Sequence, residues 1–277
     1  MRRIKLIRTA IPILEGAGVH LQRAFGYSET PLFDPFLMLD DFRNDDPDKY
    51  LPGFPWHPHR GIETITYMLA GSAEHGDNLG NSGTIHKGEV QWMTAGSGII
   101  HQEMPKPDST GKMYGFQLWA NLPAAQKMMN PRYRDIRTSD IPLVKTQEGA
   151  EIKIICGEFG NVRGSVNDIV IDPQYWDVTI PENKHIVLPT PEGHNCFIYC
   201  YGGEAIIDGQ KIGNRQTVLF EEGESISIQA LSEGFKFLFL CGKPLNEPIS
   251  WKGPIVMNTK EEIKTAFRDL SEGTFIK

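Results

Sequence analysis

The 277-residue chain has little cysteine, no excess of basic residues and no long apolar segment. Its 28 Lys and Arg are outnumbered by 35 Asp and Glu, so the formal net charge is −7. Direct nucleic-acid binding, which needs a basic patch to neutralise phosphates, is therefore not expected. No stretch approaches the roughly 18 apolar residues of a membrane span, so we expect no membrane association. Arg8, Pro12 and Glu15 interrupt the apolar stretch near the start of the chain, which argues against a signal peptide and for a cytoplasmic protein.

The four cysteines include no Cys-x-x-Cys pair. Cys196 and Cys200 share a strand-like run, in which four residues of extended chain separate their Cα atoms by about 13 Å. A disulfide needs Cα atoms within about 7 Å, so these two cannot be joined. The sequence predicts buried, reduced thiols that act as small hydrophobic side chains, with a reactive or redox-sensing thiol as the alternative.

Glycine and proline, by contrast, are frequent, with 28 and 19 residues. They separate short strand-like runs at spacings of roughly 8–12 residues, which is typical of an all-β sandwich or barrel. The polar segment 137–149 contains Pro142 and predicts a linker between two halves. One helix is predicted near the carboxyl end, because Thr259 and Glu262 form a capping box and Gly273 provides a stop. We expect its apolar stripe to pack on the exterior of a barrel.

Histidines at alternate positions are the strongest functional signal. His57 and His59 are followed about forty residues later by His101 and Glu103. Side chains at i and i+2 of a strand leave the same face, so each pair can point at one ion. Eight histidines in this chain produce about 0.2 His-x-His pairs by chance, so one pair alone is weak and the conjunction carries the prediction. Three imidazoles and a carboxylate with open coordination positions are typical of non-haem iron or catalytic zinc.

These motifs resemble the two sequence motifs of the cupin superfamily. Within it, the strings FPWHPHRGIETITYML, GEVQWMTAGSGIIHQEMP and GFQLWANLP are similar to the pirin family, as are residues 34–42 and 251–258. The resemblance implies an all-β bicupin, with two antiparallel β-barrels of jelly-roll type and a short C-terminal helix. It also implies one mononuclear iron-type site in the amino-terminal barrel. Several pirins have quercetin 2,3-dioxygenase activity, and others are regulatory cofactors that bind protein partners.

We therefore expect an N-terminal metal-binding cupin barrel in residues 1–138, and a second cupin barrel with the C-terminal helix in residues 139–277. A weak internal repeat appears when the run 67–71 is laid over 199–203. On that offset Pro189 and Pro191 stand where the first half has His57 and His59. The second barrel is predicted to have lost its metal ligands.

The generic cupin pattern and the pirin pattern select different carboxylates. The generic pattern selects Glu63, four residues after His59, whereas the pirin pattern selects Glu103. We follow the pirin pattern, and the predicted metal ligands are His57, His59, His101 and Glu103. Glu63 then becomes a candidate hydrogen-bond partner of a ligand imidazole. The alternative is a Glu63 paired with Arg60 or a backbone amide. The predicted metal is Fe(II), with Zn, Mn, Ni and Cu as alternatives.

The resemblance implies a flavonol dioxygenase that takes a small planar polyphenol and O2 as substrates. Glu103 is the predicted catalytic residue, because it can accept the proton of the 3-hydroxyl before O2 inserts and carbon monoxide leaves, with a metal-bound base as the alternative acceptor. A planar substrate needs an apolar slot, and six apolar side chains near the motifs are candidates for its lining. The alternative for each of them is a place in the hydrophobic core of the barrel. The candidates are Phe54, Trp56, Trp92, Met93, Met113 and Phe116.

Two other functions are compatible with the same residues. One is an iron-binding, redox-sensing regulatory protein that acts through protein–protein interaction. The other is a zinc- or manganese-dependent isomerase or hydrolase of small polar substrates, which would require more polar residues near the motifs than Arg60, Asn78 and Asn81 provide. Fold alone cannot separate these functions. We expect a monomer in each case.

Overall fold

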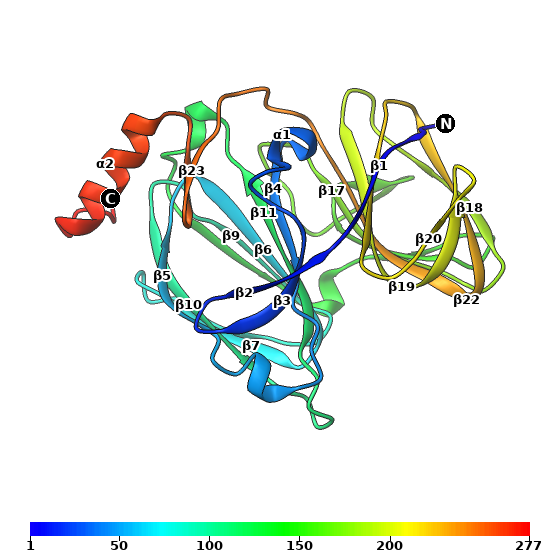
Figure 1. Cartoon of the computed structure of the whole chain (residues 1–277), viewed down its shortest axis with the longest axis horizontal. Coiled ribbons are helices and arrows are strands. Elements are labelled where there is room, and N and C mark those ends of the chain that lie inside the picture. Colours follow the sequence, from blue (N-terminus) through cyan, green and yellow to red (C-terminus); the bar gives the residue numbers. More distant parts are fainter. The chain divides into compact units, whose positions relative to one another are not determined.

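Strands dominate the computed structural model, which describes residues 1–277 (Figure 1). The chain forms two compact units, each named here for the half of the sequence that supplies most of it. The amino-terminal barrel contains residues 12–30, 36–138 and 245–277. The carboxyl-terminal barrel contains residues 1–11, 31–35 and 139–244. Residues 138 and 139 belong to different units, and the segments 1–11, 31–35 and 245–277 are each separated in sequence from the main part of the unit that contains them.

Two sheets form the amino-terminal barrel. The larger runs in the order β12 (Arg132–Ile136), β9 (Val90–Thr94), β6 (Ile62–Ala70), β11 (Tyr114–Asn121), β4 (Phe36–Asp41), β3 (Val19–Phe25) and β2 (Ile11–Glu15). The smaller runs in the order β5 (Phe54–His59), β10 (Ile99–Lys106), β7 (Ser72–Asp77) and β8 (Ser82–Ile85). Short helical turns are η1 (Pro47–Lys49) and η2 (Ala124–Gln126). The strand pairs β5–β10, β10–β7, β6–β11 and β6–β9 are antiparallel, as the resemblance to bicupins implies.

The carboxyl-terminal barrel is built on one nine-stranded sheet. Its main path is β1 (Ile4–Thr9), β21 (Gln216–Phe220), β19 (Asn195–Ile207), β22 (Ser225–Gly242), β17 (Gln174–Ile180), β14 (Glu151–Cys156) and β13 (Leu143–Lys145). Off this path, β18 (His185–Pro189) pairs with β22, and β20 (Gln210–Ile212) pairs with β19. Smaller elements are α1 (Thr30–Phe33), η3 (Thr138–Asp140), β15 (Glu158–Phe159) and β16 (Val162–Arg163).

A disulfide joins Cys196 to Cys241, which corrects the expectation of reduced thiols at these two positions. The residues lie directly opposite each other on β19 and β22, with Cα atoms 4.2 Å apart. Cys200 is the cysteine nearest to Cys196 in the sequence, whereas the bonded partner is 45 residues away. Cys156 and Cys200 keep buried thiols, as expected.

Helix α2 (Lys260–Ser271) confirms the helix predicted near the carboxyl end. The Thr259 hydroxyl accepts a hydrogen bond from the Glu262 amide, and the Glu262 side chain accepts one from the Thr259 amide. Ile263 and Ala266 are buried against β24 (Ile255–Met257), which forms a hairpin with β23 (Ser250–Lys252). Neither helix has the length and apolar character required to cross a lipid bilayer.

Candidate metal centre

Three histidines meet on two neighbouring strands of the smaller sheet. His57 and His59 lie on one face of β5, and His101 on β10 stands directly opposite His57. The Nε2 atoms of His57 and His59 are 3.0 Å apart. The ring centroid of His101 lies 4.4 Å from that of His57 and 5.0 Å from that of His59. One ring nitrogen from each histidine falls within 4.8 Å of the others, so all three can reach one ion.

Backbone carbonyls determine which nitrogen carries the proton in two of these rings. The His57 Nδ1 lies 2.8 Å from the Pro55 carbonyl oxygen, and the His59 Nδ1 lies 3.1 Å from that of Pro254. A carbonyl can only accept a hydrogen bond, so each Nδ1 donates, and the corresponding neutral tautomer presents a bare Nε2. The two lone pairs then face each other across 3.0 Å, an arrangement that a cation between them would stabilise.

His101 strengthens the case for a cation. It is 1% exposed, and neither of its ring nitrogens has a hydrogen-bond partner. Burial, reinforced by the neighbouring imidazoles, holds the pKa values of His59 and His101 well below the usual range, so both rings are neutral at pH 7. Nitrogens that bind one ion at about 2.0–2.1 Å and at right angles lie about 3 Å apart. The donor set therefore fits a borderline divalent metal.

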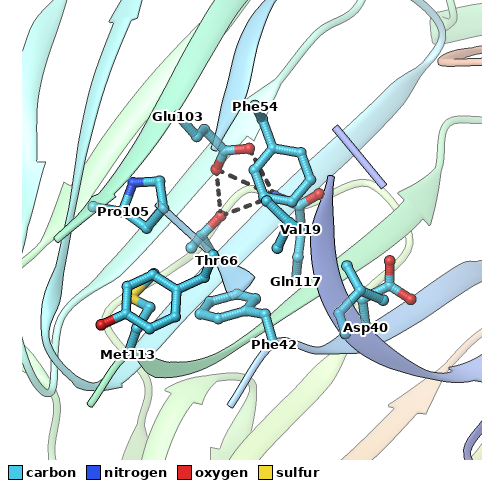
Figure 2. Close-up of a pocket in the computed structure, with 12 residues that line it drawn as sticks. Val19, Asp40, Phe42, Phe54, Thr66, Glu103, Pro105, Met113 and Gln117 are labelled. Atoms are coloured by element: carbon cyan, nitrogen blue, oxygen red, sulfur yellow. Dashed lines mark hydrogen bonds between the residues drawn. The ribbon is translucent and has the colours of Figure 1, made fainter. Parts of the chain in front are cut away.

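Glu103 lies two residues beyond His101 on β10, but its carboxylate is not part of the three-histidine group. Figure 2 shows it directed at two polar side chains of the larger sheet. The Thr66 hydroxyl donates to Oε1 at 3.1 Å, and the Gln117 amide donates to Oε2 at 2.9 Å. The Trp119 indole N–H donates to Oε1 of Gln117 at 3.0 Å, which orients that amide toward Glu103. Glu103 is thus a buried, hydrogen-bonded carboxylate beside the histidines.

Glu63 is in a different environment from the one expected. Strand β5 ends at His59. The chain then turns at Gly61, with φ +79°, and enters β6 of the larger sheet. Glu63 therefore does not share a face with His59. Its Oε1 accepts a hydrogen bond of 2.6 Å from the Thr94 hydroxyl, and burial raises its pKa. The carbonyls of Pro55 and Pro254 bind the imidazoles in its place, and Arg60 pairs with Asp269.

A cavity of about 570 Å³ opens beside His57 and His59, within the range of about 300–1,000 Å³ typical of small-molecule sites. Its walls include the aromatic side chains Tyr27, Phe54, Trp119 and Trp251. Asp40 also reaches this cavity, and its two oxygens accept hydrogen bonds of 2.8 and 2.7 Å from Arg23. Burial raises the pKa of Asp40 to about 6, although the Arg23 guanidinium opposes this shift.

Of the six predicted pocket residues, two line a cavity and four do not. Phe54 lines the 570 Å³ cavity, and Met113 lines a smaller chamber next to it. Trp92, Met93 and Phe116 are buried but line neither space, and Trp56 is 54% exposed. Sequence reasoning missed Trp119 and Trp251. Trp119 lies within the string GFQLWANLP that contributes to the family resemblance, whereas no local pattern links Trp251 to the histidines.

The carboxyl-terminal segment completes the wall of the site, a role that the sequence did not reveal. Lys127 Nζ donates to the carbonyls of Gly61 and Val256, both at 2.9 Å, and so ties that segment to the turn after His59. Burial lowers the pKa of Lys127 to about 7. Arg60 donates to Asp269 at 2.9 Å and to the Phe275 carbonyl at 2.7 Å. These contacts hold the Pro254 carbonyl against His59.

A double β-barrel with three converging histidines in one barrel is a bicupin with a candidate metal site. Sequence comparison agrees, since the family profile named pirin matches residues 18–120 and that of the pirin C-terminal cupin domain matches residues 175–276. The chain belongs to the pirin family.

Two relatives illustrate the similarity. The chain is 44% identical to a Pseudomonas aeruginosa protein named "Putative quercetin 2,3-dioxygenase", over 98% of this chain and 97% of the relative. It is 36% identical to the pirin of Homo sapiens, over 92% and 87%. A crystal structure of quercetin 2,3-dioxygenase from Acinetobacter baumannii superposes with a TM-score of 0.92 at 33% identity, covering 99% of this chain and 98% of that one.

Proposed function

We propose that this protein is a metal-dependent dioxygenase that cleaves flavonols such as quercetin with O2 and releases carbon monoxide. The observation that carries the proposal is the unpartnered, buried His101 beside two Nε2 lone pairs, at the edge of a cavity with aromatic walls. The names of the similar proteins from P. aeruginosa and A. baumannii support the substrate class. We infer that Fe(II) is the metal.

His57, His59 and His101 would hold the ion, and Glu103 is proposed as the fourth ligand because it follows His101 by two residues on one strand. When bound, the metal supplies Lewis acidity and a path for electrons between the flavonol and O2. The protein supplies the geometry, since carbonyl hydrogen bonds fix two of the imidazoles before any ion arrives. Fixed ligands reduce the reorganisation that binding would otherwise require.

Glu103 is proposed to accept the proton of the flavonol 3-hydroxyl at one of its carboxylate oxygens. Hydrogen bonds from the Thr66 hydroxyl and the Gln117 amide fix the orientation of the Glu103 carboxylate, so that it can serve as a positioned base. In the reaction, both atoms of O2 enter the flavonol, one ring carbon leaves as carbon monoxide, and the remainder is a phenolic ester.

The aromatic walls are suited to a flat substrate. Trp119 and Trp251 have ring centroids 5.8 Å apart and planes inclined by 35°, and Trp119 lies 5.1 Å from the His59 ring. Aromatic faces bind planar rings by offset stacking and exclude water from the reacting centre. We infer that these two side chains position the flavonol next to the histidines.

Oxygen uptake by anaerobically purified, Fe(II)-loaded protein on addition of quercetin tests the proposal, with carbon monoxide measured as product. We expect one carbon monoxide per O2 consumed, and loss of both signals in a folded His101→Ala variant. Circular dichroism of the variant checks the fold. No uptake by protein that retains its iron would refute the dioxygenase and favour a regulatory role through protein partners.

A further inference from the structure

A second, much smaller chamber lies behind Glu103 (Figure 2). Its volume is about 40 Å³. Asp40, Phe54, Glu103 and Gln117 line both this chamber and the 570 Å³ cavity, so they form the partition between the two. The rest of its wall is mainly apolar and includes Val19, Leu21, Phe42, Ala73 and Met113.

The side-chain donors of the chamber wall are already engaged. Thr66 and Gln117 donate to Glu103, and the Tyr50 hydroxyl donates to the Gly111 carbonyl at 2.8 Å. The Asp40 carboxylate accepts both of its strong hydrogen bonds from Arg23. A tightly bound water makes about three hydrogen bonds. Here the wall leaves it no donor, and the carboxylates that could accept from it, Asp40 and Glu103, stand only on the side shared with the 570 Å³ cavity. The chamber therefore favours an apolar occupant.

Size restricts that occupant to a molecule of very few atoms. The chamber exceeds the roughly 10–15 Å³ that one water requires, and it is far below the roughly 300 Å³ of the smallest ordinary ligand pockets. A flavonol cannot enter it. Dry cavities with aliphatic and aromatic walls bind apolar guests such as xenon.

We propose that this chamber is a binding site for dioxygen, which it delivers to the metal centre past Phe54 and Glu103. The inference rests on the proposed function, in which O2 is the second substrate. O2 is apolar and diatomic, so it matches both the wall and the size of the chamber. Glu103 lies two residues from His101, and the partition therefore separates the chamber from the histidines by a single side-chain layer. Carbon monoxide has the same chemistry and is the competing occupant.

Xenon provides a direct probe that does not depend on turnover. Crystals of the protein pressurised with xenon are expected to show anomalous density between Val19, Leu21 and Met113. A Met113→Ala variant, which enlarges the chamber, is expected to raise the xenon occupancy. Absence of xenon from the chamber in both proteins would overturn the proposal.

Filling the chamber provides the kinetic test. Ala73→Val adds two methyl groups at the chamber wall, and Ala205→Val adds the same groups to the core of the carboxyl-terminal barrel as a matched control. We expect Ala73→Val to raise KM for O2 several-fold, with KM for the flavonol and metal content unchanged and with normal kcat at saturating O2. The control is expected to leave all four quantities unchanged. Thermal unfolding of both variants reports any cost of overpacking.

The outcomes separate the two proposals. Xenon in the chamber without flavonol turnover would refute the dioxygenase and leave the gas site in place. Turnover with an unchanged KM for O2 in Ala73→Val would refute delivery from the chamber. Added carbon monoxide that competes with O2 in the wild-type protein but not in Ala73→Val would show that the product shares the site. If it inhibits both proteins equally, it acts elsewhere and O2 alone uses the chamber.

Discussion

The two barrels share a fold class but differ in what occupies their interiors. The amino-terminal barrel contains the 570 Å³ cavity, three converging histidines and the chamber behind Glu103. The core of the carboxyl-terminal barrel is filled by apolar side chains, among them Trp176 stacked on Phe239 with ring centroids 4.3 Å apart. A disulfide joins the neighbouring strands β19 and β22 of its sheet.

This difference shows how one architecture separates binding from stability. At the repeat positions where one barrel has His57 and His59, the other has prolines, and large aromatic side chains fill the space between its strands. Filling a core maximises burial of apolar surface, whereas keeping a cavity leaves side chains without close-packed neighbours. The chemistry therefore resides in a few inward residues rather than in the fold.

Tryptophan truncation in the two barrels is the largest expected contrast. Trp176→Ala removes a fully buried ring from a filled core and is expected to lower the free energy of unfolding by about 3–5 kcal/mol. Trp119→Ala opens onto an existing cavity, so its cost is smaller, while KM for the flavonol rises. Chemical denaturation of both variants measures the difference. Equal destabilisation would show that the interiors are packed alike.

Removal of the disulfide sharpens the comparison on the stability side. Cys196→Ala combined with Cys241→Ala is expected to lower stability by about 2–4 kcal/mol, because the bond restricts the unfolded chain across 45 residues. The histidine site belongs to the other unit, so bound metal per chain is expected to stay at the wild-type level. Elemental analysis of the folded variant measures the bound metal, and denaturation measures the stability. Loss of metal from the folded variant would contradict the expectation.

A pH effect is expected from Asp40 in the amino-terminal barrel. Its folded-state pKa, about 6, lies above the ordinary value of 3.8, so the folded protein binds more protons between these pH values. Stability contributed by protonated Asp40 is thus present at low pH and is lost as pH rises through 6, by about 3 kcal/mol. Asp40→Asn should lose this dependence. Denaturation of both proteins at pH 4 and pH 7 gives the difference, and parallel profiles would refute the shift.

Local patterns in the sequence predicted the parts of the site that lie within one element. Alternation placed His57 and His59 on one face, and the Thr259 capping box located α2. The alternation does not extend from His59 to Glu63, because the strand ends at His59 and the chain turns at Gly61. The alternation of side chains between the two faces predicts which residues share a face only within one continuous strand.

Contacts between distant segments could not be predicted in this way. The Pro254 carbonyl reaches His59 from nearly two hundred residues away, and Lys127 and Arg60 hold it there. The partner of Cys196 lies on another strand for the same reason. Such pairings depend on strand order and on the path of the carboxyl-terminal segment, which no short motif encodes.

Metal stoichiometry in matched histidine variants tests the central claim most directly. His101→Ala removes a residue of the three-histidine group, and His185→Ala removes one from the carboxyl-terminal barrel, where its Nε2 contacts the Ser227 hydroxyl at 2.7 Å. Elemental analysis of the purified proteins after equilibration with Fe(II) is predicted to give one ion per chain in the wild type and in His185→Ala, and none in His101→Ala. Full metal content in a folded His101→Ala protein would contradict the account.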